Sequence, residues 1–137
     1  LCDWDFVAVS DCSHGDVIDI CRKSVIFLSF GHPEGFGLPV AEAMACGCAV
    51  VGYSGLGGRE LFALGERFGV AKEVPFGDWP CFLRSVHEID SLLNKDLNCF
   101  TDCLVSLSRD IRKLYSFGEM IVSVRLALER IEAAVAS

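Results

Sequence analysis

The stretch that decides the fold is FGHPEGFGLPVAEAMACGCAVVGYSGLGGRE, which runs from Phe30 to Glu60. It holds eight of the chain's 13 glycines, two of its four prolines and three glutamates. Glycine frees the backbone for tight turns, and carboxylates accept hydrogen bonds from hydroxyl and amide groups. The stretch is therefore either a pair of strand-to-helix turns alone or a site for a hydroxyl-rich, phosphate-bearing ligand.

Apolar runs and helical patterns alternate on both sides of this stretch. Strands are predicted at residues 5–10, 25–30 and 48–53, with a short further strand within 68–74. Helices are predicted at residues 17–24, at 39–47 with Gly47 as the stop, from about Gly58, and at 79–94. Pro39 suits a helix start, because its fixed φ fits there and its missing amide hydrogen would lack a partner. This alternation predicts an α/β fold whose parallel strands are joined by right-handed crossovers.

From Asp96 onward the periodicity is helical only. One apolar stripe contains Phe100, Cys103, Leu104, Leu107, Ile111 and Leu114. Ser116 and Glu119 have the spacing of a capping box, and a second apolar stripe follows them: Met120, Val124, Leu128, Ile131 and Val135. The chain is thus predicted to close with two packed helices. No repeat or linker divides residues 1–137 into separate domains.

Length and composition fit one domain with a sizeable core. Hydrophobic residues make up 52% of the chain against 23% charged residues, which excludes a disordered chain and fits a sheet buried on both faces. The formal net charge of -7 argues against nucleic acid as a partner and against electrostatic docking on an anionic membrane. No apolar run reaches the ~20 residues of a transmembrane helix, so no transmembrane segment is predicted.

The eight cysteines form no Cys-x-x-Cys pair, and no His-x-x-x-His lies nearby, so no metal site is predicted. Several lie in apolar segments, where a free cysteine behaves as a small buried hydrophobe. Because the sequence shows no secretory signal, they are interpreted as reduced thiols of a cytoplasmic protein. Cys99 and Cys103, four residues apart on one helix face, are interpreted as core neighbours.

Both glycine loops follow predicted strands, and open parallel sheets bind ligands beyond the carboxyl ends of their strands. If the strands are neighbours, two helix N-termini point into one crevice and favour an anion such as phosphate. Glu34 lies on the first loop, and Glu42 lies near the start of the next helix. Two carboxylates flanking a set of amides match a nucleotide sugar, with hydroxyls at both ends and a diphosphate between. On the simpler interpretation the helix dipole alone favours Glu42, and Glu34 is a solvated loop residue.

The residues PEGFGLPVAEAMACGCAVV, followed by GGRE, resemble the signature of the family-four glycosyltransferases, also called group-one glycosyltransferases. The resemblance is specific over Val25–Glu60 and extends more loosely to most of the chain. It implies a Rossmann-like parallel sheet with flanking helices. This unit is the carboxyl-terminal, nucleotide-sugar-binding half of the GT-B architecture.

By position, the resemblance implies that Glu34 hydrogen-bonds the donor sugar and is the catalytic residue of the pair, and that Glu42 binds the ribose. It also implies donor contacts through the amides of the first loop and a diphosphate-binding second loop: Gly35, Phe36, Gly37 and Leu38, then Gly57 and Gly58. The family tends to carry a glutamate where Glu60 stands. His14 falls in a loop where relatives often receive the nucleobase, and His32 lies close to Glu34; neither is given a role.

The implied reaction is sugar transfer from a nucleoside diphosphate sugar to an acceptor, with retention at the anomeric carbon and no further cofactor. The departing diphosphate needs stabilisation of its negative charge, which such enzymes supply with helix N-termini and basic side chains. Relatives place an Arg and a Lys upstream, whereas this sequence has no basic residue between Lys23 and Arg59. The amino-terminal acceptor lobe is missing as well. We therefore expect a fragment or half-enzyme that is inactive or incomplete alone and needs that lobe in cis or in trans.

Three other interpretations stay open. A non-catalytic nucleotide-sugar-binding or interaction module would keep the fold without the basic pair. An epimerase of related architecture would bind the same kind of ligand, although the spacing of Glu34 and Glu42 around GFGLP disfavours it. A phosphate-binding flavodoxin-like domain would explain the glycine loops but not the two carboxylates.

Overall fold

The computed structural model describes residues 4–31 and 35–135. In chain order its elements are α1 (His14–Lys23), β1 (Ile26–Ser29), α2 (Leu38–Cys46), β2 (Ala49–Gly52), α3 (Arg59–Arg67), β3 (Ala71–Glu73), α4 (Trp79–Lys95), α5 (Leu97–Leu114) and α6 (Phe117–Val135). The strands form one parallel sheet in the order β1-β2-β3, with Ile26 opposite Ala49 and Val50 opposite Ala71. The predicted α/β fold is confirmed, including the short strand before α4.

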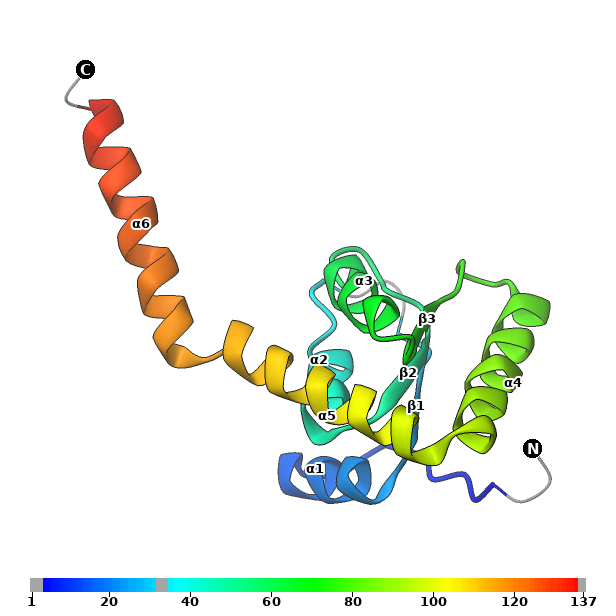
Figure 1. Ribbon diagram of the computed structural model, residues 1–137. Helices are drawn as coiled ribbons and strands as arrows, with labels where there is room; N and C mark the ends of the chain where they lie inside the picture. The colour runs from blue at the N-terminus through cyan, green and yellow to red at the C-terminus, as the bar shows by residue number, and fades with distance from the viewer. Residues whose placement is uncertain (1–3, 32–34, 136–137) are drawn as a thin grey trace.

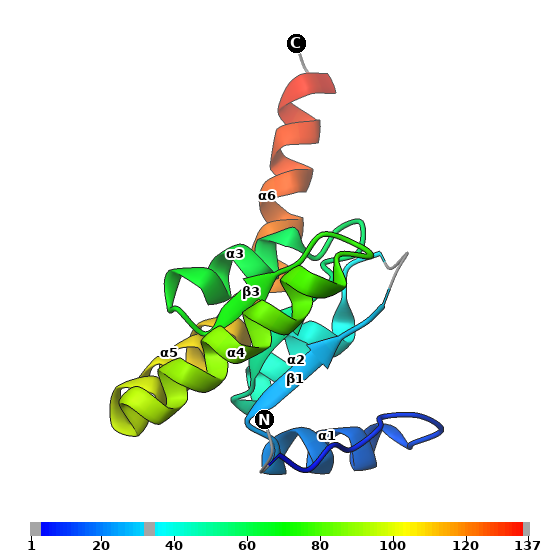
Figure 2. The same ribbon diagram turned by 90° about the vertical axis from the view of Figure 1, so that its right-hand side faces the viewer.

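Helices cover both faces of the sheet (Figures 1 and 2). The connections α2 and α3 lie on one face, and α4, which follows β3, lies on the other. α5 packs on α2, as does α1. The central strand β2 is completely buried, so its side chains are apolar without alternation, as expected for a parallel sheet covered on both sides.

Local signals explain where the helices begin and end. The Ser13 hydroxyl accepts a hydrogen bond from the Asp16 amide, and the Asp16 carboxylate accepts one from the Ser13 amide. This capping box starts α1 three residues earlier than its apolar pattern predicts. Gly37 and Gly47 flank α2 with φ angles of 83° and 93°, which residues other than glycine rarely adopt.

Residues 5–10 do not form the predicted strand. Residues 4–13 contain no helix or strand, and Phe6, Val7 and Val9 are exposed. Instead, Trp4 Nε1 donates a hydrogen bond to Asp90 Oδ1 on α4 at 2.8 Å, which ties the segment to a helix. The prediction is wrong because a strand needs a neighbour for its backbone hydrogen bonds, and no described strand pairs with this segment.

The chain closes with two helices, as predicted, and α5 belongs to the core. Its buried residues are four members of the predicted stripe: Phe100, Leu104, Leu107 and Ile111. Ser108 and Arg112 on α5 both donate hydrogen bonds to the carbonyl oxygen of Ala45. These bonds satisfy a carbonyl in the last turn of α2 and fix the crossing of the two helices.

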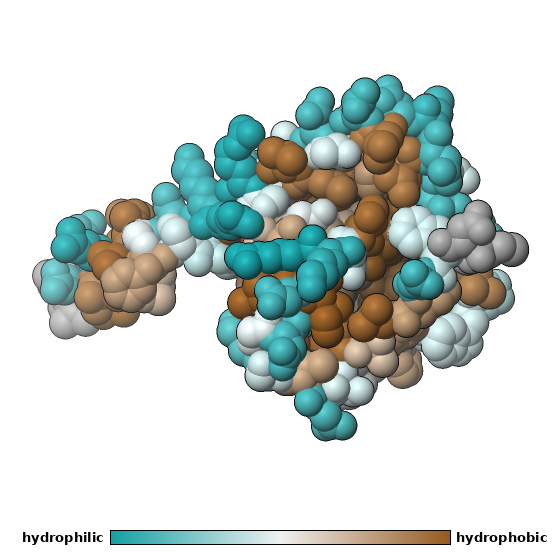
Figure 3. All heavy atoms as spheres, turned by 90° about the horizontal axis from the view of Figure 1, so that it is seen from below, coloured by the Kyte–Doolittle hydropathy of each residue, from teal (hydrophilic) through white to brown (hydrophobic). Residues whose placement is uncertain are grey.

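α6 projects away from the rest of the chain (Figure 1). The Glu119 amide donates to Ser116 Oγ at 3.2 Å, which is one half of the predicted capping box. The Ser116 amide donates to the Lys113 carbonyl oxygen at 3.2 Å and not to Glu119, so the box is incomplete. However, every side chain described from residue 117 to 134 is exposed, including Leu128 and Ile131. Figure 3 shows this uncovered helix on the left, with hydrophobic and hydrophilic side chains side by side. The second apolar stripe therefore does not pack against α5 as predicted. Periodicity defines which face of a helix is apolar, but it does not define which element that face packs against.

The cysteines among the described residues are all free thiols. Cys48 is fully buried, and its Sγ donates to the Cys21 carbonyl oxygen at 3.1 Å. Burial, followed by the neighbouring thiols, raises the pKa of Cys48 to about 12. Cys103 packs against the core as expected, whereas Cys99 is exposed, so the two are not a buried pair.

Candidate functional site

The two glycine loops touch each other at the carboxyl edge of the sheet. The first loop follows β1 and leads to α2, and the second follows β2 and leads to α3. A Cβ added at Gly57 would lie 2.5 Å from the Gly35 carbonyl oxygen, and one at Gly58 would lie 3.2 Å from the Phe36 carbonyl oxygen. These glycines are therefore needed for close backbone packing between the loops, whether or not a ligand binds.

The first loop presents unused backbone donors. Among the described residues, none accepts a hydrogen bond from the amides of Gly35, Phe36, Gly37 or Leu38. α2 and α3 have no side-chain cap, whereas side chains cap α1, α4 and α5. Gly58 differs, because its amide already donates to the Ser54 carbonyl oxygen at 3.0 Å. No described residue accepts from the amides of Gly55, Leu56 or Gly57 either, so both glycine loops offer backbone donors to an anion.

Glu42 lies in the second turn of α2, slightly later than the sequence indicated, and its side chain is about one-third exposed. Its Oε1 lies 3.7 Å from Nδ1 of His14, the first residue of α1. The structure therefore brings His14 to one of the predicted ligand-binding carboxylates. Sequence reasoning noted both residues but did not pair them, because the contact depends on how α1 packs on α2.

Glu34, the predicted catalytic glutamate, lies outside the described residues, and so does His32. The role of Glu34 therefore stays a prediction. The structure describes this loop from Gly35 onward, which includes the amides that follow Glu34 in the chain.

Tyr115, directly after α5, contacts both the first glycine loop and α3. Its hydroxyl donates to Glu60 Oε1 at 2.9 Å, and its ring meets the Phe36 ring edge-on at a centroid distance of 5.2 Å. Burial, followed by the hydrogen bond and the charge of Glu60, raises the pKa of Tyr115 to about 12. The pair braces the first loop against α3. No local pattern in the sequence could have found it, because the two residues belong to distant elements.

Arg59 is the cation nearest in sequence to the second loop. Its Nε lies 3.5 Å from Glu73 Oε1, which also accepts a hydrogen bond from Ser54 Oγ at 2.6 Å. The Arg59 side chain is 82% exposed, so this ion pair is largely solvated and exchanges partners at little cost. Arg59 can therefore turn towards a phosphate without leaving a buried charge unpaired.

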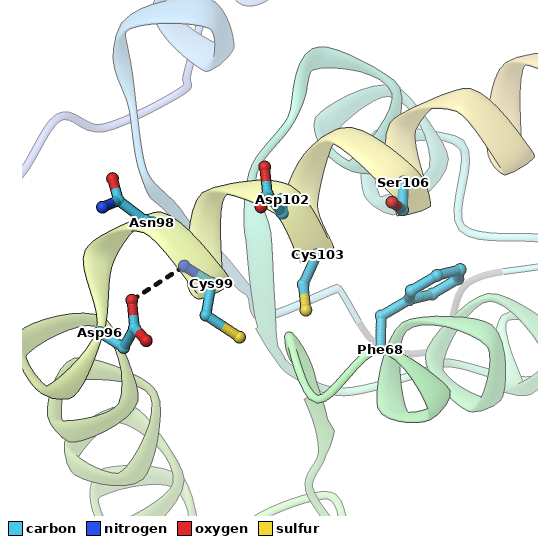
Figure 4. A pocket seen from close by; sticks show the side chains of 7 residues that line it. All are labelled: Phe68, Asp96, Asn98, Cys99, Asp102, Cys103 and Ser106. Carbon is cyan, nitrogen blue, oxygen red and sulfur yellow. Dashed lines mark hydrogen bonds between the residues drawn. The ribbon is translucent and has the colours of Figure 1, made fainter.

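A surface hollow of about 440 Å³ lies elsewhere, along the first turns of α5 (Figure 4). None of the predicted site residues lines this hollow. Its lining residues are Phe68, Asp96, Asn98, Cys99, Asp102, Cys103 and Ser106. Asp96 already caps α5 through the Cys99 amide at 3.0 Å. Because Phe68 precedes β3, this hollow lies towards the amino ends of the strands, away from the glycine loops.

The described residues contain no group of three or more His, Cys, Asp or Glu side chains arranged to hold a metal ion. None of their helices combines the length and apolar character required to cross a membrane.

Known proteins resemble the part of the chain that carries the glycine loops. The family described as glycosyl transferases group 1 matches residues 7–75, about half of the chain. An alpha-1,6-glucosyltransferase of Actinobacillus pleuropneumoniae serotype 7 (strain AP76) is 39% identical over 51 residues, which cover 37% of this chain and 16% of that protein. No solved structure matches the chain. Since the family match spans both glycine loops, the chain belongs to the group 1 glycosyltransferases.

Proposed function

We propose that this chain is the donor-binding part of a retaining glycosyltransferase of the GT-B type. It binds a nucleoside diphosphate sugar, whose sugar is then transferred to an acceptor. The observation that carries the proposal is the set of four amides at residues 35–38 from which no described residue accepts a hydrogen bond. They lie beside the second glycine loop and lead into α2, which carries Glu42 in its second turn. Such a set binds a diphosphate without a metal ion.

Each part of the donor has a matching group. The diphosphate lies against the amides of Gly35, Phe36, Gly37 and Leu38. Gly57 and Gly58 form the second loop beside the diphosphate. Glu42 accepts hydrogen bonds from the ribose hydroxyls, and Glu34 from the hydroxyls of the transferred sugar, where it acts as the catalytic glutamate. Carboxylates suit both tasks, because each oxygen accepts from hydroxyl donors.

Charge on the departing diphosphate is the main chemical demand of the reaction. The partial positive charge at the start of α2 meets part of it, and the exposed Arg59 meets another part by exchanging Glu73 for a phosphate oxygen. The ribose likewise replaces His14 at Glu42, since the His14 side chain is 72% exposed and its pair with Glu42 is weak. An amino-terminal acceptor lobe, in cis or in trans, completes the site in a cytoplasmic enzyme.

The transferred group is proposed to be a hexose. The support is the activity named for the relative, an alpha-1,6-glucosyltransferase, which aligns with this chain over 51 residues. Because that alignment covers 16% of the relative, the acceptor and the linkage formed are not carried over.

A second candidate function is a non-catalytic nucleotide-sugar-binding module. It is favoured by the charge distribution, since residues 24–58 contain no Lys or Arg and Arg59 is paired with Glu73. The two functions differ in turnover and not in donor binding. Adding an acceptor-binding lobe to the chain would restore transfer if the chain is part of an enzyme, and would leave binding without transfer if it is a module.

A thermal-shift screen tests donor binding directly. The full chain is heated with uridine, guanosine, adenosine and thymidine diphosphates and with the glucose conjugate of each. The diphosphate of one nucleoside and its glucose conjugate are expected to raise the melting temperature. A ligand at about 100 times its Kd stabilises the native state by about 2.7 kcal/mol. If none of the eight compounds shifts the transition, the proposed function is wrong. For Glu34→Ala, the loss is expected mainly in turnover and sugar discrimination in the enzyme completed by its acceptor lobe.

A further inference from the structure

Tyr115 lies far outside the region that matches the family, yet it contacts the proposed donor site. The match ends at residue 75, and Tyr115 directly follows α5. Its ring lies edge-on to Phe36, whose amide is one of the four proposed diphosphate donors, and its hydroxyl donates to Glu60 in the first turn of α3. The matched region therefore does not contain every residue that shapes the first glycine loop.

Phe36 is held on two sides. Its backbone lies against the second loop: a Cβ at Gly58 would lie 3.2 Å from the Phe36 carbonyl oxygen, and one at Gly57 would lie 3.6 Å from the Phe36 Cα. Its side chain lies against the Tyr115 ring, at a centroid distance of 5.2 Å and an interplanar angle of 65°. Edge-on contacts of this kind are a stable arrangement for aromatic pairs. With backbone and side chain both held, the direction of the Phe36 amide is restrained before a ligand arrives.

The contact comes from a firmly anchored helix end. Ile111, one turn before Tyr115, is buried in the core, and its carbonyl oxygen accepts from the Tyr115 amide at 3.0 Å. Arg112 holds the same turn to α2 through the Ala45 carbonyl oxygen, at 2.9 Å from Nε and 2.7 Å from Nη2. A side chain placed by a packed helix supports a loop more rigidly than a second loop would.

The hydroxyl of Tyr115 keeps its ring on Phe36. A surface hollow of about 430 Å³ lies between α3 and the end of α5, and Tyr115 and Glu60 both line it. The hollow leaves the ring room to turn away, since 45% of Tyr115 is exposed. The hydrogen bond to Glu60 Oε1 at 2.9 Å opposes that movement. Glu60 is itself well placed, because the helix dipole favours a carboxylate in the first turn.

Core packing does not account for this pair. The buried residues of α5 end at Ile111, whereas Tyr115 and Glu60 are both exposed. A hydrogen bond between exposed side chains adds little to the free energy of unfolding, because both groups bond to water when the chain unfolds. The main effect of the pair is therefore expected at the loop that it contacts.

We propose that Tyr115 is a positioning residue for the donor diphosphate: its ring and hydroxyl hold Phe36 so that the amides of residues 35–38 keep the direction in which they bind phosphate oxygens. The inference rests on the proposed function, because it concerns how that site binds its donor. Tyr115 acts through Phe36 and not by touching the ligand. A loop that is already ordered loses less conformational entropy on binding, so the affinity for the diphosphate rises.

Calorimetric titration of the full chain with the nucleoside diphosphate selected by the thermal screen measures this effect. Tyr115→Leu removes the ring and the hydroxyl and is expected to raise the Kd about tenfold, which matches the entropy of ordering roughly one loop residue. Tyr115→Phe keeps the ring and is expected to raise the Kd about threefold. Phe117→Leu is the matched control, because Phe117 is 73% exposed at the start of α6, and it should leave the Kd unchanged.

The matching nucleoside separates positioning from a general loss of structure. It carries the ribose that Glu42 binds but no phosphate, and NMR titration follows its weaker binding. In Tyr115→Leu the nucleoside should bind as in the parent chain while the diphosphate binds more weakly, with circular dichroism showing that each variant is folded at the titration temperature. An equal loss for both ligands would give Tyr115 a general structural role and overturn the inference.

Other outcomes distinguish this inference from the proposed function. Equal diphosphate affinity in the parent chain and in Tyr115→Leu overturns the positioning role and leaves the donor site standing. A parent chain that binds neither ligand contradicts the donor site, and the positioning role falls with it.

A pair of milder variants decides the question if Tyr115→Leu does not fold. Tyr115→Phe and Glu60→Ala should each raise the diphosphate Kd about threefold. The double variant should bind no more weakly than either single variant, since all three lack the same hydrogen bond. Independent effects that multiply in the double variant would contradict the shared role of the two side chains.

Discussion

Gly57 packs so closely against Gly35 that a Cβ at position 57 would lie 2.5 Å from the Gly35 carbonyl oxygen. Real Cβ atoms do not approach an oxygen this closely. The contact couples the two glycine loops, so the geometry of the amides on the first loop depends on the second. The glycines of GLGG thus have a structural role that can be measured separately from ligand binding.

Gly57→Ala is expected to destabilise the chain by about 1–3 kcal/mol, because the new methyl group pushes the two loops apart. Urea denaturation followed by circular dichroism measures the change. Gly35→Ala is the matched control from the facing loop. A Cβ there would meet no atom within 4 Å, so its effect should stay within about 0.5 kcal/mol. Equal stability of the two variants would show that the loops are not packed as described.

Glu42→Ala is expected to weaken nucleotide binding about tenfold or more, because a charged acceptor of ribose hydroxyls is lost. The fold should be retained, since the pair with the exposed His14 contributes little. Isothermal titration calorimetry with the nucleotide selected by the thermal screen measures the effect. Glu129→Ala, which removes the same charge from exposed α6, is the control. If both variants bind like the parent chain, Glu42 does not hold the ribose.

Tyr115 is expected to ionise only near about pH 12, because burial and the Glu60 carboxylate both favour its neutral form. The folded-state pKa of Tyr115 lies above the ordinary tyrosine value of 10.0, so the native state holds the proton more tightly than the unfolded state. The stabilisation is complete below about pH 10 and is lost as the pH rises towards 12.

Near-ultraviolet absorbance of tyrosinate in a Tyr53→Phe background reports Tyr115 alone, because the chain has two tyrosines. Glu60→Gln should lower the pKa of Tyr115 but leave it raised, since burial is the larger cause. A pKa that does not respond to Glu60→Gln would contradict the hydrogen bond between the two residues.

Cys48 is expected to resist alkylation in the folded chain at about pH 8, because it is buried and its pKa is raised to about 12. Cys99, which is exposed, should react faster than Cys48. Peptide mass spectrometry after timed treatment with iodoacetamide gives both rates, and unfolding in urea should make them similar. Rapid labelling of Cys48 in the native protein would be incompatible with its burial.

Much of the fold could be predicted from local patterns. A strand, a turn and a helix are predicted in that order by the apolar run before Phe30, by Gly35 and Gly37, and by Pro39. The structure has the three elements in the same order. The same logic failed for residues 5–10, whose apolar residues are exposed on a segment without a strand partner. The candidate site was predictable as two neighbouring loops, whereas the pairs His14–Glu42 and Tyr115–Glu60 were not.

The sequence by itself determined the alternation of strands, glycine turns and helices, the burial of β2 and the family, because these depend on periodicity, backbone freedom and a contiguous motif. Tertiary structure alone decided that Gly57 closes on Gly35, that Tyr115 braces the first loop and that α6 lies uncovered. The physical reason is that such contacts join surfaces far apart in the chain. Their formation depends on how the helices cross the sheet, which no local pattern specifies.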